Sequence, residues 1–154
     1  MVVRNGDKRV IQRRALESRF HLRNESEANL LGVVYTDAGA MTGAPYAVVD
    51  DGHWVFAGTG LRKGELFGQR CLHMRCPGGA SGHETDKVSA SSPKNVRILA
   101  KGTNPDNGGA EMVSYQTSTG GAVFSTGSIN FVSSLPVDNA VSQITANVLK
   151  RFLA

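Results

Sequence analysis

The chain has 154 residues, of which 40% are hydrophobic and 19% charged. That balance is ordinary for a globular domain with one core and excludes a disordered chain. No stretch reaches the roughly 20 consecutive apolar residues that a membrane helix needs. The amino end lacks the basic and then apolar layout of a secretory signal. We therefore expect no membrane partner and a cytoplasmic location.

The formal net charge is +4 and the isoelectric point is about 9.3. Aromatic residues make up only 6% of the chain, and no zinc-finger, helix-turn-helix or ribonucleoprotein signature accompanies the basic residues. We therefore predict an acidic protein partner and no nucleic acid. The two cysteines are too few for a disulfide scaffold, so reduced thiols are expected. Five of the 17 basic residues lie between positions 8 and 19: Lys8, Arg9, Arg13, Arg14 and Arg19.

The first third of the chain predicts a polar lead-in and then short strands. Residues 1–29 are polar and charged and favour no single element. Residues 30–35 are continuously apolar and rich in β-branched side chains, which is typical of a buried strand. Residues 46–49 and 53–57 are two further strand candidates, and the turn at 50–52 separates them.

The middle of the chain, 58–94, is predicted to consist mainly of loops. A strand is expected at 96–100 and a long turn at 101–109. Glycine at high density in a folded chain usually marks backbone that passes close to another group. The loop region holds seven glycines: Gly58, Gly60, Gly64, Gly68, Gly78, Gly79 and Gly82.

The last third contains the clearest patterns. Residues 111–116 and 122–125 flank paired glycines and predict a β-hairpin. Asp138 is a predicted N-cap for a helix over 139–153. Apolar residues along that helix recur every three or four positions and define one face that packs on a sheet: Val141, Ile144, Val148 and Phe152. The whole chain, 1–154, is therefore predicted to be a single α/β unit, with a mixed sheet and a C-terminal amphipathic helix.

The glycine-rich stretch 78–87 holds the groups best suited to chemistry. His83, Glu84 and Asp86 can each bind a metal or move a proton. In extended backbone Glu84 and Asp86 would point to one side and His83 to the other. A solvated loop with a surface ion pair is the alternative interpretation of the same residues.

A second cluster contains Cys71, His73 and Cys76. These are three zinc-competent ligands, but structural zinc sites use four, and the sequence offers no second knuckle. Buried thiols beside a hydrogen-bonded histidine are the favoured interpretation, and a small zinc-stabilised interaction domain is the alternative. The sequence contains no nucleophile elbow, Walker loop or dinucleotide-binding fingerprint.

Several segments, taken together and in order, resemble the carboxy-terminal region of the N,N-dimethylformamidase large (beta) subunit family. The resemblance runs from about residue 30 to the end. The segment ending at 129 and the final helix are its most specific parts. The segments that carry the resemblance are 53–61, 64–68, 79–87, 109–129 and 135–152.

The resemblance implies part of an amidotransferase-like three-layer domain with a mononuclear iron bound by two tyrosines and one glutamate. Oxygen donors of that kind suit ferric iron, which can polarise an amide carbonyl and acidify a bound water. The implied reaction is the hydrolysis of small N-substituted formamides, such as N,N-dimethylformamide to formate and dimethylamine.

Residue by residue, the family's iron-binding glutamate corresponds to Glu84, which the resemblance makes both a catalytic residue and the metal ligand. His83 is the accompanying catalytic candidate for ligand orientation or proton transfer, and Glu111 is a weaker carboxylate candidate. The family's iron-binding tyrosines lie upstream of the matched region, so the motif assigns none of the three tyrosines in this sequence as a ligand: Tyr35, Tyr46 and Tyr115.

The sequence thus predicts a C-terminal fragment of a larger polypeptide that is inactive alone. Its expected partners are the rest of the large subunit, with or without a small accessory subunit, and a small amide substrate, with an oligomer as the assembled state. A non-catalytic α/β interaction module that keeps the fold without the metal site is the alternative hypothesis.

Overall fold

The computed structural model describes residues 25–39 and 41–154. Most of the predicted lead-in, 1–29, therefore lies outside the described residues. The predicted strand at 30–35 is only partly right, because a short helix α2 (Ala28–Leu31) occupies its start and β1 (Val34–Thr36) its end. Gly32 has φ +80°, a conformation that glycine adopts at little cost, and it ends the helix.

Short strands and turns make up the middle of the fold, and two helices close it. The strands after β1 are β2 (Gly43–Ala44), β3 (Tyr46–Val48), β4 (Leu66–Phe67), β5 (Ser81–Gly82), β6 (Thr85–Lys87), β7 (Arg97–Gly102), β8 (Glu111–Gln116) and β9 (Ala122–Ser125). The 3₁₀ helices are η2 (Trp54–Phe56) and η3 (Pro105–Asn107), and the last α-helices are α3 (Asn130–Ser134) and α4 (Asn139–Leu153).

The strands form three antiparallel sheets. The largest has five strands in the order β4, β3, β7, β8, β9, and the pairs β1 with β6 and β2 with β5 are separate. The predicted combination of sheet and C-terminal helix is confirmed. The predicted mixed sheet is wrong, because every strand pairing in the described residues is antiparallel. Parallel neighbours need a long crossover, usually a helix, and α4 follows the last strand instead of joining two.

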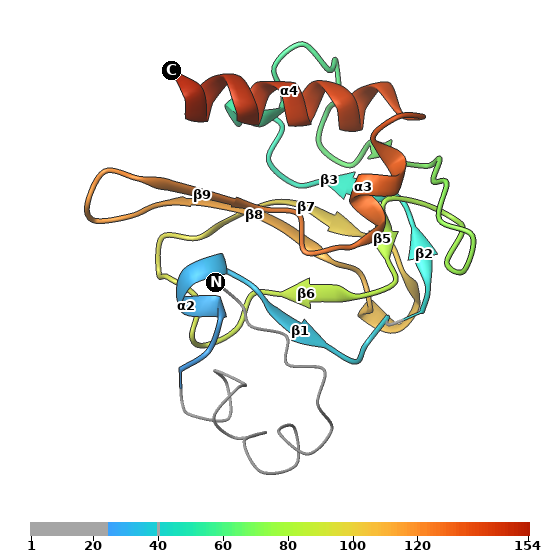
Figure 1. Ribbon diagram of the computed structural model, residues 1–154, viewed down its shortest axis with the longest axis horizontal. Coiled ribbons are helices and arrows are strands. Elements are labelled where there is room, and N and C mark those ends of the chain that lie inside the picture. The colour runs from blue at the N-terminus through green and yellow to red at the C-terminus, as the bar shows by residue number, and fades with distance from the viewer. Residues whose placement is uncertain (1–24, 40) are drawn as a thin grey trace, which may run out of the picture.

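The predicted hairpin and helix are confirmed with the same bounds. The side chain of Asp138 accepts hydrogen bonds from the first turn of α4, as its N-cap position predicts. Val141, Ile144 and Val148 are buried in one core with side chains of the five-stranded sheet. Phe152 is half-exposed at the end of that face and packs against Trp54. Figure 1 shows α4 along one side of the sheet and the β1–β6 pair on the other.

The predicted strand at 53–57 is wrong, because η2 occupies most of it. The Nδ1 atom of His53 accepts a hydrogen bond from the Val55 amide and starts the turn. The Asn147 side chain on α4 donates to the carbonyls of Val55 and Ala57. Those carbonyls therefore bond to a helix side chain instead of a neighbouring strand, which is why the apolar pattern there does not form a strand.

The glycine-rich loops pass close to other backbone of the same chain. A Cβ on Gly79 would lie only 2.3 Å from the carbonyl carbon of Ala44, so any larger residue would displace backbone. This contact holds the segment before β5 against the β2–β3 connection, and it accounts for part of the glycine density noted in the sequence. Among the described helices, none is both long and apolar enough to cross a membrane.

Candidate functional site

Glu84 and Asp86 line one cavity of about 280 Å³. The Asp86 amide donates to the carbonyl of Gly127, and Thr85 forms a bridge with Ser128. These bonds hold β6 against the segment that joins β9 to α3. The predicted sharing of one side by Glu84 and Asp86 is therefore confirmed.

The cavity is acidic. Burial raises the pKa of Asp86 to about 6, and the negative charges of Glu84 and Glu27 add to the increase. In the part of the chain that the structure describes, no lysine or arginine pairs with either Glu84 or Asp86. Asp86 therefore takes up a proton at a higher pH than an ordinary aspartate, and the exposed Glu84 lies beside it at the cavity.

Tyr35 belongs to the same acidic region, although the sequence did not place it there. It lies opposite Asp86 in the β1–β6 pair and is about half-exposed. A hydrogen bond with Asp37 raises the pKa of its phenol most, followed by desolvation and the charges of Asp37, Glu84 and Asp86. Tyr35 and Asp86 lie 51 positions apart in the sequence, and only the strand register brings them together.

The other two tyrosines are engaged elsewhere. The Tyr46 hydroxyl donates to the carbonyl of Thr126 at 2.7 Å, and burial raises the pKa of that phenol well above its usual range. The Tyr115 hydroxyl donates to the carbonyl of Leu30. Both phenols are therefore committed to backbone groups.

The acidic cavity fits an iron ion in donor type but not in donor number. Carboxylate and phenolate oxygens suit a hard ferric ion. In residues 25–39 and 41–154, however, Glu84 and Asp86 do not belong to any group of three histidine, cysteine or carboxylate ligands that converge within coordination range. This chain can therefore supply Glu84 as one ligand, and further ligands would have to come from elsewhere.

Glu111 has a structural role. It is 7% exposed, and its two carboxylate oxygens accept from the Val88 amide at 2.9 Å and pair with the Lys101 ammonium at 2.8 Å. It lies on β8, an interior strand of the five-stranded sheet, so it is not a strand-edge charge. Both oxygens are satisfied, which makes Glu111 a poor metal candidate.

His83 lies with a different set of groups. Its Nδ1 atom is 3.7 Å from the Cys76 sulfur, and its ring centroid is 4.6 Å from that of His73. Of the predicted ligands Cys71, His73 and Cys76, the structure brings the last two together with His83 and leaves Cys71 out. The Cys71 sulfur instead accepts from the His73 amide and lies 3.8 Å from the Asn130 carbonyl oxygen. The catalytic role of His83 stays a prediction.

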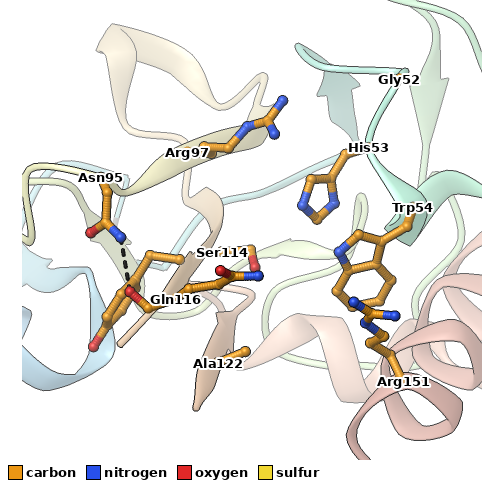
Figure 2. A pocket seen from close by; sticks show the side chains of 10 residues that line it. Gly52, His53, Trp54, Asn95, Arg97, Ser114, Gln116, Ala122 and Arg151 are labelled. Atoms are coloured by element: carbon orange, nitrogen blue, oxygen red, sulfur yellow. Dashed lines mark hydrogen bonds between the residues drawn. The ribbon is translucent and has the colours of Figure 1, made fainter. Parts of the chain in front are cut away.

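A second cavity, of about 550 Å³, is lined by basic and neutral side chains and holds none of the predicted site residues (Figure 2). Arg97 reaches it from β7 but pairs with Asp50. Arg151 points from α4 toward Trp54. Burial and the Arg97 charge lower the pKa of His53 at its rim. Among the described residues, this lining contains no carboxylate, which separates it chemically from the Glu84 cavity.

The described residues thus define an antiparallel α/β unit with an acidic cavity on the side away from α4. The family described as N,N-dimethylformamidase beta subunit-like, C-terminal, matches residues 3–144, and the chain belongs to it.

Two curated relatives carry a related name. An N,N-dimethylformamidase beta subunit of Paracoccus aminophilus is 35% identical, with 49% of this chain and 14% of the relative covered. An N,N-dimethylformamidase beta subunit of an Alcaligenes species is 33% identical with the same coverage. The match therefore spans about one seventh of the length of these relatives.

Proposed function

We propose that this chain is part of an iron-dependent amide hydrolase that cleaves the C–N bond of small N-substituted formamides. Its family membership and the names of its relatives support this class of reaction. The observation that carries the proposal for these residues is the cavity that Glu84 and Asp86 share without a basic partner in the described chain.

In this proposal Glu84 supplies one ligand of a mononuclear iron. The remaining ligands come from the rest of the large subunit, to which the chain contributes part of an amidotransferase-like three-layer domain. The assembled enzyme is an oligomer that can include a small accessory subunit. When bound, the iron polarises the amide carbonyl and makes a bound water more acidic.

Asp86 in the cavity and Tyr35 beside it act on protons and on position. Burial raises the pKa of Asp86 to about 6, so this carboxyl group close to Glu84 can gain or lose a proton in mildly acidic solution. Tyr35 lies opposite Asp86 and keeps its phenol protonated, because the neighbouring carboxylates disfavour a phenolate. The Tyr35 phenol can therefore donate a hydrogen bond beside the cavity, and the Asp86 carboxylate can accept one from a polar substrate within it.

The test uses the complete enzyme that contains this chain, with Glu84→Gln as the variant. Removing the charged oxygen should release most of the iron and lower formate production from N,N-dimethylformamide by about 100-fold or more. Metal content and formate release are the two measurements. Glu65→Gln is the matched control, because Glu65 is an exposed glutamate that lies outside this cavity. Full iron content and full activity in Glu84→Gln would overturn the proposal.

A further inference from the structure

Three side chains from two loops converge at a point outside the acidic cavity. His73 and Cys76 lie between β4 and β5, and His83 lies between β5 and β6. One donor atom from each residue lies within 4.8 Å of the other two. We propose that His73, Cys76 and His83 form a transition-metal site that suits Zn²⁺, separate from the iron of the proposed function.

The donor types and spacing fit this ion. Zinc takes imidazole nitrogen and thiolate sulfur at about 2.0 to 2.3 Å, which places neighbouring ligands of a tetrahedral site about 3.5 Å apart. The Cys76 sulfur and the His83 Nδ1 atom are already 3.7 Å apart. Movements on the order of 1 Å by flexible side chains would bring the third donor to the same spacing.

The backbone on both sides of the site is fixed. Cys76 is buried, and its carbonyl accepts from the side chain of the fully buried Asn130 at 2.8 Å. The His83 amide donates to the Thr42 carbonyl, and its own carbonyl accepts from the Met41 amide. Two ligands therefore project from anchored backbone, which lowers the entropy lost on metal binding.

His83 also adopts a conformation that side chains rarely take. Its φ is +67°, in the left-handed region that costs a residue other than glycine of order 1 kcal/mol. The conformation aims the imidazole at Cys76 and His73 instead of along the strand. Strain of this kind concentrates at ligand sites, and a bound metal would offset it.

One hydrogen bond competes with the metal. The His73 Nδ1 atom accepts from the Cys76 amide at 3.1 Å, so a neutral ring carries its proton on Nε2. Binding through Nδ1 would replace this bond directly, and binding through Nε2 would require a proton on Nδ1. Either way the metal displaces one hydrogen bond, so the affinity should be below that of a closed four-ligand site.

The site has a structural consequence for its neighbour. Three protein ligands leave a fourth position for water or an exogenous group. The metal would tie the loop before β5 to the β5–β6 connection, where His83 directly precedes Glu84. Its donors are nitrogen and sulfur, whereas the acidic cavity offers oxygen, so the two sites would select different ions.

The experiment titrates metal into the full 154-residue chain, prepared metal-free and reduced. Zn²⁺ in competition with a chromophoric chelator should give one equivalent bound, and Co²⁺ should give a thiolate charge-transfer band. Cys76→Ser should abolish the band and weaken Zn²⁺ binding by about 100-fold or more, because two ligands remain. Cys71→Ser is the matched control and should stay within about threefold of the parent chain, since Cys71 lies outside the set.

A second variant separates metal binding from folding. His83→Asn keeps a side chain that tolerates positive φ, so circular dichroism should remain native while Zn²⁺ binding weakens about as much as in Cys76→Ser. Substoichiometric Zn²⁺ binding by the parent chain would overturn the inference, and so would a Cys71→Ser loss equal to that of Cys76→Ser. Neither result bears on the iron, which the Glu84→Gln measurements test independently.

Discussion

The two sides of the five-stranded sheet are stabilised in different ways. On the α4 side, apolar side chains of the helix and the sheet share one buried core. On the opposite side, the β1–β6 pair is short, and the Thr85 hydroxyl bonds it to the carbonyl of Ala38. The β2–β5 pair is also short and is held by bonds of the Ser81 and Ser128 hydroxyls to backbone amides. The carboxylates Glu84 and Asp86 lie on the side where short strand pairs are bonded by polar side chains. Their placement depends on individual hydrogen bonds and close backbone contacts.

Ser81 and Asn104 show how the polar side works. The Ser81 hydroxyl donates to the Asn104 side chain at 2.6 Å and accepts from the Ala110 amide at 3.0 Å. Asn104 then donates to the hydroxyl of Thr42 at 2.7 Å and to the carbonyl of Ser81. This network joins β5 to the β7–β8 connection, which contains Asn104 and Ala110, and to Thr42 just before β2. Ser81, Asn104 and Ala110 are buried, so water cannot replace a bond that is lost among them.

The largest predicted effect lies on the apolar side. Ile144 is completely buried on the face of α4 that packs against the sheet. Ile144→Ala should lower the free energy of unfolding by about 3 to 4 kcal/mol, because it removes buried surface and leaves a cavity. Urea denaturation measures the loss. Leu149→Ala, at a position on the same helix that is 55% exposed, should cost less than about 1 kcal/mol. Equal losses at both positions would contradict the assigned face of the helix.

A smaller effect is expected on the polar side. Ser81→Ala removes one partner each from Asn104 and the Ala110 amide, both of which are buried. The free energy of unfolding should fall by about 2 kcal/mol, in the range for stranded buried polar groups. Ser91→Ala, at an exposed position in the turn between β6 and β7, is the control and should change stability by under about 0.5 kcal/mol. If Ser81→Ala were neutral, apolar contacts would have to stabilise this side as well.

The smallest effect depends on pH and concerns η2 at the junction with α4. Burial and the Arg97 charge lower the pKa of His53, so the unfolded chain takes up a proton first as the pH falls. The stability contributed by neutral His53 is present above its unfolded pKa of about 6.5 and is lost as the pH falls through the folded value. The loss should be at most about 0.5 kcal/mol, because solvent screens a half-exposed ring.

His53→Asn tests this assignment. Asparagine can accept the same hydrogen bond from the Val55 amide but does not titrate. Urea denaturation between pH 7 and pH 5 should therefore show a shallower decline for the variant than for the parent chain, since the other histidines contribute equally to both. Parallel declines would show that His53 does not contribute to the acid sensitivity.

The sequence by itself determined the elements whose signals are local. The 3.6-residue spacing of Val141, Ile144 and Val148 and the cap at Asp138 defined α4, and paired glycines between two strand-like runs defined the β8–β9 hairpin. The family pattern pointed to Glu84, and strand alternation placed Asp86 on the same side. Apart from the family pattern, these features depend only on neighbours within a few positions.

Tertiary structure decided the rest, because it depends on contacts between residues far apart in the sequence. The apolar run at 53–57 forms a 3₁₀ helix, and the Asn147 side chain donates to two of its carbonyls. The sheets are antiparallel because no crossover helix joins neighbouring strands. Only the β1–β6 register places Tyr35 beside Asp86. Only the two loops around β5 bring His83, rather than Cys71, to His73 and Cys76, since ligand convergence is a property of packed loops and not of sequence spacing.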